Sequence, residues 1–559
     1  MLNSTPRTYL VWSFSALAFI AVAMTAWIIP LRMYFGNNGS YFTFVHMYDE
    51  LIYAGRIQPL VAGATCANPV NGIGDPRYIS QFFLEDSVRA VLTLLHLDVI
   101  TAFWLWRALF PIAVMASLYL LAGECVPQCA RVSGAALRVA AAALGAALLS
   151  LEPLVVYSPP QGWSERVPTN IEYPLSILMA WFYLRALRKP SPLRAALLSL
   201  CLVATVYWRF YLAIPWAIAL AGGAMALFIQ RRFGIRTFLA TIGILVAAMS
   251  PWLAIVVSNS RLPVNTELMY RYFTFAESSV RVHPYWEFYV RMAGAIAIAG
   301  MLLRGNSRII CITTGAGLCI TPFIYRFFPM RSELLGFNRL SSFYLTAALT
   351  ALLLCIGAAA GARRWRQTGT RGAWVVLLAC SLAVSGVMSL RNSRYAFAEE
   401  EGSEYTAAQQ EIPFIPALNW IRNNTPEDAL FFTDDGCDMS RMGFSDELGI
   451  FISSGVGRFG LFPIVARRRC VFNGKLFVSN ISTRELAELA QLHWTTLGYP
   501  GDQKVWAQLL KRYHPDYIIW RKSNPQLQAA ASRLGSLCTP VYSDAAAEVW
   551  KMDVDAMTP

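Results

Sequence analysis

Two adjacent carboxylates, Asp49 and Glu50, stand in residues 46–55, and Tyr53 follows them by about one helical turn. A carboxylate in a partly desolvated cleft can act as a general base, because burial raises its pKa from about 4. Adjacent side chains on a helix point about 100° apart, so both carboxylates cannot face one substrate equally. The alternative interpretation is a solvated acidic pair that caps a helix. Asp49 is therefore a candidate base, with Glu50 as the neighbouring candidate.

The elements that must position these carboxylates are strongly apolar. The chain has 559 residues, of which 56% are hydrophobic and 14% charged, and its mean hydropathy is +0.43. A soluble domain averages about 25% charged residues, so this composition excludes a single water-soluble fold. Residues 1–390 are apolar stretches separated by short polar loops, whereas residues 391–559 have the composition of a soluble domain. The sequence predicts a transmembrane domain over 1–390 and a soluble α/β domain over 391–559.

The predicted fold class is an α-helical multispanning membrane protein. A membrane-crossing helix needs about 20 apolar residues. Residues 9–31 have no small-residue cleavage site after them, which indicates an anchor and not a cleaved signal. About eleven stretches qualify by length and composition: 9–31, 101–123, 136–157, 171–187, 194–212, 213–230, 237–257, 287–303, 309–325, 340–360 and 373–390.

The charges on alternate loops predict the orientation. With the N-terminus in the cytoplasm, the inside segments of 1–390 hold sixteen basic residues and one acid, Glu124, while the rest of this region is nearly balanced. Basic loops are retained on the cytoplasmic side, and an odd number of spans then places residues 391–559 outside the cytoplasm. The basic pI near 9.3 arises from these loops and does not indicate a nucleic-acid partner. Abundant arginine and alanine with only six lysines favour a bacterial source, so the predicted location is the inner membrane of a bacterium.

Two predicted outer segments are large. The first outer loop covers 32–100, and its residues 85–100 have the periodicity of a helix lying on the membrane surface. The C-terminal region alternates predicted helices (417–423 and 503–513) with predicted strands (429–433, 516–520 and 547–552). Its cysteines Cys437, Cys470 and Cys538 could form one disulfide in an oxidising compartment.

The chain resembles the GT-C superfamily of membrane glycosyltransferases in three features. An acidic pair follows the first span, an aromatic residue lies one turn later, and the long outer loop ends in a surface helix. The resemblance covers the architecture of nearly the whole chain, but only short motifs carry it. It implies transfer of a sugar from a polyprenyl-phosphate carrier to a cell-envelope glycan or lipid on the extracytoplasmic face. It assigns the base to Asp49, with Glu50 beside it and Tyr53 near the substrate.

The resemblance also implies arginines that bind the departing phosphate, since the guanidinium fork matches phosphate oxygens. Arg339, at the outer start of a late span, fits best, and Arg331 is second. Arg166 and His283 lie in two other outer loops and are further candidates; the loop 258–286 is long enough to cover a site. For most of these side chains, attraction to lipid headgroups is an equal alternative.

A divalent metal ion is a further candidate component of the predicted site. The resemblance implies a second acid in the outer loop 158–170, where Glu165 with Asp49 could hold Mg²⁺ or Mn²⁺, which prefer oxygen ligands. The loop has no Asp-x-Asp string, and other superfamily members rely on arginine instead of a metal. A loop salt bridge between Glu165 and Arg166 is at least as good an interpretation.

Two other classes of function remain open from the sequence. A lipid or glycan transporter or flippase would be favoured by pseudo-symmetric halves or by polar groups at the middle of the membrane. A non-catalytic membrane scaffold would use the outer domain to bind partners, and Asp49 would then face lipid or open solvent.

Overall fold

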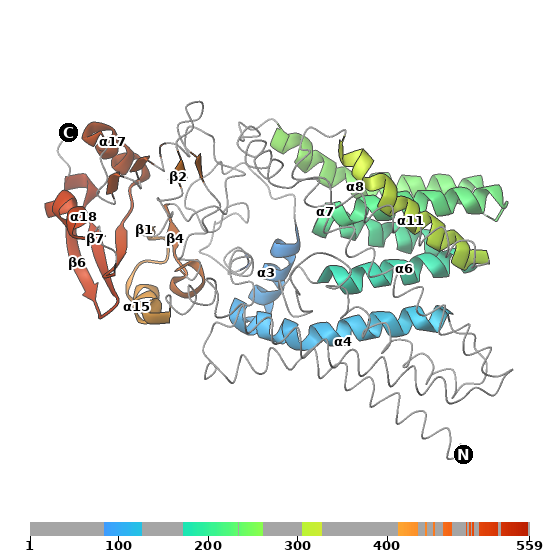
Figure 1. Ribbon diagram of the computed structural model, residues 1–559, viewed down its shortest axis with the longest axis horizontal. Coiled ribbons are helices and arrows are strands. Elements are labelled where there is room, and N and C mark those ends of the chain that lie inside the picture. The colour runs from blue at the N-terminus through green and yellow to red at the C-terminus, as the bar shows by residue number, and fades with distance from the viewer. Residues whose placement is uncertain are drawn as a thin grey trace, which may run out of the picture. The chain divides into compact units, whose positions relative to one another are not determined.

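The chain divides into two compact units. The first comprises Met1–Thr43, Phe103–Leu253 and Phe273–Ala398, and the second comprises Phe44–Ala102, Ala254–Tyr272 and Glu399–Pro559. The elements are drawn in Figure 1. This computed structural model describes residues 57, 83–125, 171–232, 234–260, 305–326, 412–433, 442–443, 451–452, 462–471, 488, 491–492, 495–496, 502–523 and 527–556.

Residues 83–125 form two helices that meet at a short turn. Helix α3 (Phe83–Leu95) stops at His96, whose φ of 53° is left-handed. Asp98 then caps helix α4 (Val99–Cys125), its Oδ1 accepting hydrogen bonds from the N–H groups of Ile100 (3.0 Å) and Thr101 (2.9 Å). The helix predicted over 85–100 is therefore wrong at its C-terminal end, because Asp98 starts a new helix.

The described residues that follow form further apolar helices: α6 (Glu172–Arg188), α7 (Pro192–Ile229), α8 (Ile235–Ser260) and α11 (Gly305–Arg326). They confirm helical structure for the stretches predicted at 171–187, 194–212, 213–230, 237–257 and 309–325, as α4 does for 101–123. By length and composition, one helix of the described residues could cross a membrane, at Ile235–Ala254. The number of spans stays a prediction, since the other five stretches lie outside the described residues: 9–31, 136–157, 287–303, 340–360 and 373–390.

The 38 residues of α7 do not form one straight rod. A straight helix of that length would measure about 57 Å. Yet Arg194 at its start donates to the carbonyls of Arg185 (3.1 Å) and Lys189 (3.2 Å), while Arg232 just after its end donates to the carbonyl of Leu187 (3.0 Å). Both ends therefore lie at the C-terminal end of α6, and the chain must turn back within α7. This agrees with the prediction of two consecutive apolar stretches, and Pro215 lies within the segment.

Close packing of α6, α7 and α11 depends on small residues facing a buried tyrosine. The Tyr183 hydroxyl donates to the carbonyl of Ala219 (2.9 Å) and is 2.8 Å from the Thr313 Oγ1. A Cβ atom added at Gly223 would overlap the Tyr183 ring, and one added at Gly317 would overlap the Pro215 carbonyl oxygen. The two glycines thus let the helices approach as closely as they do.

Gly317→Ala is expected to destabilise the helical unit by about 1–3 kcal/mol, because backbone atoms of α7 must move to admit the methyl group. Gly243→Ala in α8 is the matched control, since an added Cβ there meets no atom within 4 Å. The control should be neutral or slightly stabilising because alanine has the higher helix propensity. Thermal unfolding of the detergent-solubilised proteins measures both, and equal stability of the two variants would contradict the packing argument.

The C-terminal region forms a small α/β lobe around a five-stranded mixed sheet of order β4-β1-β5-β7-β6 (Figure 1). β4 and β5 pair in parallel with β1, whereas β7 pairs antiparallel with both β5 and β6. The strands are β1 (Leu430–Thr433), β4 (Arg469–Cys470), β5 (Tyr517–Arg521), β6 (Cys538–Ser543) and β7 (Ala547–Met552), and a separate pair is formed by β2 (Met442–Gly443) and β3 (Phe451–Ile452).

Helices complete the lobe and bury an aromatic core. In this core the rings of Trp520 on β5 and Trp550 on β7 are 5.9 Å apart, and the Trp506 Nε1 donates to the Thr496 Oγ1 (3.0 Å). The helical segments are α15 (Ile415–Asn424), α17 (Gln503–Tyr513) and α18 (Leu527–Leu534), the 3₁₀ turns Ile412–Phe414, Gly535–Leu537 and Val554–Ala556, and the π turn Phe462–Ala466. All five elements predicted for this region are present, within two residues at each end.

Candidate functional site

The residues predicted from the sequence to carry the chemistry lie outside the described residues. The structure therefore neither brings them together nor separates them, and their roles remain predictions. They are Asp49, Glu50, Tyr53, Glu165, Arg166, His283, Arg331 and Arg339.

The described part of the first outer loop that precedes Phe103 belongs to the same compact unit as the lobe. Within this unit, the charge of Arg467 in the lobe acts on Asp98 in the loop. Burial tends to raise the pKa of Asp98, but hydrogen bonds from Thr101 and Ile100 and the positive charge of Arg467 outweigh it and hold that pKa below its ordinary value. The Thr101 hydroxyl also donates to the Asp98 Oδ2 (2.6 Å). Asp98 is thus an ionised cap whose oxygens are already engaged, which does not suit a general base.

Three consecutive arginines, 467 to 469, precede and enter β4, and the middle one is structural. Arg468 is buried, and its guanidinium donates to the Thr425 carbonyl (2.7 Å), the Arg422 carbonyl (2.9 Å) and the Thr425 hydroxyl (3.1 Å). These are groups at the C-terminal end of α15, where backbone carbonyls lack helical partners. Arg468 therefore closes this helix and is not available to a ligand.

Arg467 differs from its neighbour. Its φ is 53°, it is half-buried, and its Nε is a buried donor with no hydrogen-bond partner among the described residues. Burial lowers the pKa of Arg467, the like charge of Arg422 lowers it further, and Asp98 opposes both. The Arg467 guanidinium is thus acted on by a like charge and by one carboxylate, and its Nε is free of the contacts that hold Arg468.

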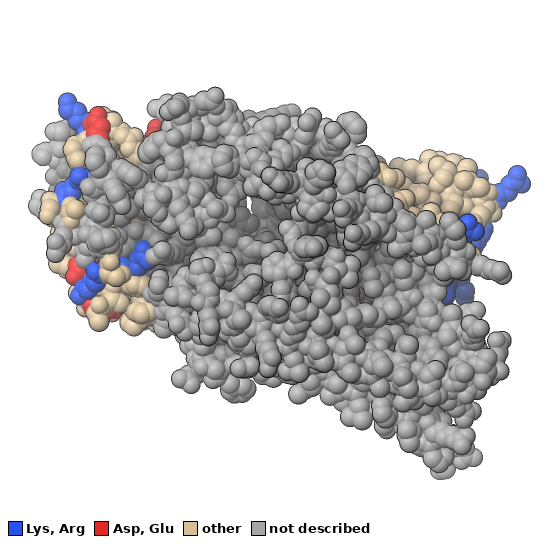
Figure 2. All heavy atoms as spheres, in the orientation of Figure 1, with Lys and Arg blue, Asp and Glu red and all other residues tan. Residues whose placement is uncertain are grey.

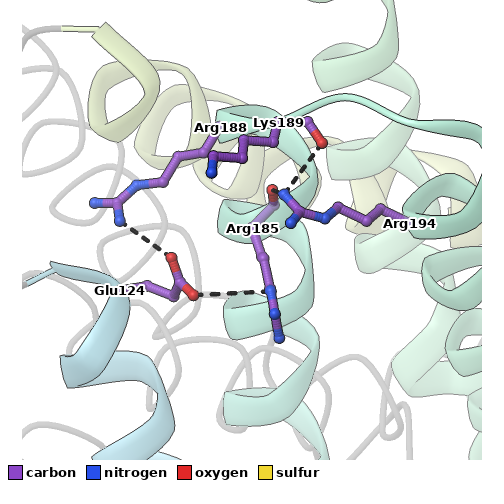
Figure 3. A network of polar contacts seen from close by, with 5 residues as sticks. All are labelled: Glu124, Arg185, Arg188, Lys189 and Arg194. Atoms are coloured by element: carbon purple, nitrogen blue, oxygen red, sulfur yellow. Dashed lines mark hydrogen bonds and ion pairs between the residues drawn. The ribbon is translucent and has the colours of Figure 1, made fainter.

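A second polar network joins helix ends in the first unit (Figure 3). The Arg188 Nη1 donates to the Glu124 Oε2 (3.1 Å), and the Arg185 Nε lies 3.9 Å from the Glu124 Oε1. Arg194 reaches the carbonyls of Arg185 and Lys189, as described above. Glu124 and the four basic residues are among those that the loop charges predict to be cytoplasmic, and the structure shows that they meet at one end of the helices. Figure 2, in the orientation of Figure 1, shows basic side chains in blue at the right-hand ends of these helices.

No group of three or more His, Cys, Asp or Glu side chains that could hold a metal occurs within the described ranges. The predicted ligands Asp49 and Glu165 lie outside those ranges, so the metal prediction rests on the sequence alone.

The described cysteines of the lobe are free thiols. Burial raises the pKa of Cys538 to about 12 and that of Cys470 well above its ordinary value. Since the thiolate is the reactive form, neither residue is suited to nucleophilic chemistry. The disulfide that the sequence allowed does not involve either of them in this structure.

Comparison with solved structures yields a weak similarity, whereas the two sequence comparisons yield none. No protein-family profile and no curated protein sequence matches the chain. Among solved structures, the archaeal oligosaccharyltransferase AglB from Archaeoglobus fulgidus, in complex with an inhibitory peptide and a dolichol-phosphate, is similar with 12% identity and a TM-score of 0.42. The match covers 93% of this chain and 70% of that chain. A likeness at this level assigns neither a fold family nor an activity to this chain.

Proposed function

We propose that the chain is a GT-C-like membrane glycosyltransferase that moves a sugar from a polyprenyl-phosphate carrier to a cell-envelope glycan or lipid. The observation that carries this proposal is the acidic pair Asp49–Glu50, placed between an apolar N-terminal stretch and α3. Helix α3, which follows this pair in the sequence, belongs to the same compact unit as the C-terminal lobe. A reaction at a membrane surface needs a carboxylate, a helix in contact with lipid and a water-exposed lobe, and the sequence supplies the carboxylate before α3.

Helix α3 supports a location at the membrane surface. Its last turns leave Val91, Leu94 and Leu95 exposed, Leu94 by 79%, while Leu92 is buried. Exposed leucines on a short amphipathic helix suit contact with acyl chains near the headgroups. We place this face and the lobe outside the cytoplasm of a bacterial inner membrane, following the charge distribution of the loops.

In the proposed reaction, the acceptor hydroxyl oxygen attacks the anomeric carbon of the carrier-linked sugar. The bond between this carbon and the phosphate oxygen breaks, its electron pair leaves with the polyprenyl phosphate, and the hydroxyl proton passes to the Asp49 carboxylate. Arg339 and Arg331 bind the leaving phosphate, while Tyr53, Arg166 and His283 contact the substrates. If Asp49 and Glu165 hold Mg²⁺ or Mn²⁺, the ion would supply further charge neutralisation at the phosphate.

The proposal is tested with the purified full-length protein in proteoliposomes that contain a radiolabelled polyprenyl-phosphate sugar and envelope glycolipids as acceptors. Release of unglycosylated polyprenyl phosphate together with a labelled acceptor is the expected result. If the donor is moved across the bilayer without being consumed, the protein is a transporter. If it is neither consumed nor moved, the scaffold interpretation replaces both.

Arg339→Lys is expected to weaken donor binding about tenfold, because a lysine ammonium cannot reproduce a bidentate contact to phosphate. The stability of the detergent-solubilised protein should change little, since the residue is predicted to lie at the membrane surface. Binding of a polyprenyl phosphate to both proteins, measured by native mass spectrometry, checks this. Equal affinities would refute the assignment of Arg339.

A further inference from the structure

The basic end of the helices in the first unit is held together by arginine. The Arg232 Nη1 donates to the Asn306 Oδ1 at the start of α11 (3.1 Å), and its Nη2 donates to the carbonyls of Leu187 (3.0 Å) and Arg188 (3.2 Å) at the end of α6. Terminal helix carbonyls lack intrahelical partners and carry the negative end of the helix dipole. Arg232 thus links two helices and has its own charge compensated by the protein.

The charges of three further arginines at this end are also compensated by groups of the protein. Arg194 donates to two carbonyls at the end of α6, while Arg185 and Arg188 share the carboxylate of Glu124. Contacts with helix carbonyls, with Asn306 and with Glu124 therefore account for four of the eight described basic residues at this end.

The other four basic residues have no such explanation, and we call them the headgroup patch. They are exposed, and within the described ranges their side chains make no hydrogen bond or ion pair. Their positions in the sequence place them at the same end of the helices. Two of them are adjacent to Arg188 or Arg232, and the other two lie in the first turn of α8 or of α11. The headgroup patch consists of Lys189, Arg231, Arg236 and Arg308.

Arg231 shows that the charge is not required by the backbone. Its φ is 55°, and its N–H donates to the Phe228 carbonyl (2.9 Å) while that of Arg232 donates to the Leu227 carbonyl (2.9 Å). This pattern ends a helix with a left-handed residue, a position that glycine occupies without steric cost. The helix end therefore does not require an arginine side chain at this position, and glycine would be less strained here.

We propose that the headgroup patch binds the phosphate groups of anionic phospholipids. Arginine matches phosphate oxygens, and basic residues beside apolar helices attract anionic headgroups. A lipid also has acyl chains, and exposed apolar side chains lie directly beside the patch on α7 and α8. This combination favours a phospholipid over a soluble anion, which would leave the apolar surface uncovered. The apolar residues are Met225, Phe228, Ile229, Ile235 and Leu239.

The inference shares with the proposed function only the location in a membrane, and it does not depend on glycosyl transfer. It concerns the end of the helices that the loop charges place in the cytoplasm, whereas the proposed chemistry lies at the other face. The two proposals can therefore fail independently.

The test compares the full-length protein with the triple variant Arg231→Gly, Arg236→Gln, Arg308→Gln. Native mass spectrometry of the detergent-solubilised proteins measures binding of phosphatidylglycerol and phosphatidylcholine. Wild type should prefer phosphatidylglycerol, and the variant should bind it on the order of a hundredfold more weakly, about fivefold for each charge removed. Turnover of the polyprenyl-phosphate sugar in detergent should not change, because these residues are not part of the proposed site.

The control removes three charges elsewhere, with Lys504→Gln, Lys511→Gln and Lys551→Gln on the exposed surface of the lobe. It should keep the phosphatidylglycerol affinity of wild type. Arg231→Gly alone should retain or increase thermal stability, so that weaker lipid binding cannot be attributed to unfolding. The proposal is overturned if the patch variant binds phosphatidylglycerol as wild type does, if control and patch variants lose affinity equally, or if wild type shows no preference between the lipids.

Discussion

Asp49→Asn is expected to lower the turnover of a polyprenyl-phosphate sugar by about 10²–10⁴-fold, equivalent to roughly 3–5 kcal/mol of transition-state stabilisation. Asparagine keeps the size of aspartate and most of its hydrogen bonding, but it cannot accept the proton of an acceptor hydroxyl. Expression and thermal stability should change little, because the predicted role of Asp49 is chemical. Single-turnover kinetics with saturating donor measures the effect on the chemical step directly.

Glu50→Gln is the matched control for this substitution. It removes a carboxylate at the next position, and it should have a much smaller effect if only one of the pair faces the substrate. Near-wild-type turnover by Asp49→Asn would exclude Asp49 as the base. A large loss in Glu50→Gln alone would transfer the role to Glu50 and leave the proposed reaction in place.

Arg468→Met is expected to destabilise the C-terminal lobe by about 3–5 kcal/mol. The substitution keeps an unbranched side chain in a buried position, but it leaves the carbonyls of Arg422 and Thr425 and the Thr425 hydroxyl without their donors. Each buried polar group left unpaired costs about 1–3 kcal/mol. Hydrogen–deuterium exchange of the full-length protein, followed in peptides that cover α15 and β1, reports the loss as faster exchange.

Arg422→Met provides the comparison, because the Arg422 side chain is exposed and only its carbonyl takes part in this network. Its effect should stay within about 0.5 kcal/mol, as is usual for surface substitutions. If the amide hydrogens of α15 and β1 exchange at the same rate in both variants, the hydrogen bonds of Arg468 do not cap the C-terminal end of α15.

Elements with strong local signals could be predicted almost to the residue. Helix α17 has an apolar stripe and an N-terminal Asp502 whose Oδ1 accepts from the N–H groups of Lys504 (2.8 Å) and Val505 (3.3 Å), and its predicted bounds are confirmed. Strand β7 is confirmed over Ala547–Met552. In both cases the signal is local: the side-chain pattern lies within the element, and the cap of α17 is the residue directly before it.

Elements that depend on distant partners were missed. Strand β4 has only two residues, and their extended backbone follows from pairing with β1. Strand β6 contains Pro540, which argues against a strand by composition but is tolerated because β6 is at the edge of the sheet. The end of α3 was missed for a different reason: Asp98 reads as part of one helix until the left-handed His96 shows that the chain turns before it.

The sequence by itself determined the division into an apolar and a soluble region, the one-sided distribution of basic residues and the candidate carboxylate Asp49. These follow from composition and spacing along the chain, which need no knowledge of partners. Only the tertiary structure decided that Arg468 is a structural residue and that four of eight clustered basic residues are compensated by helix carbonyls, Asn306 and Glu124. A charge can be counted from the sequence, but its partner can be separated from it by many residues: Arg232 and the carbonyl of Leu187 are 45 residues apart and meet only because α7 reverses.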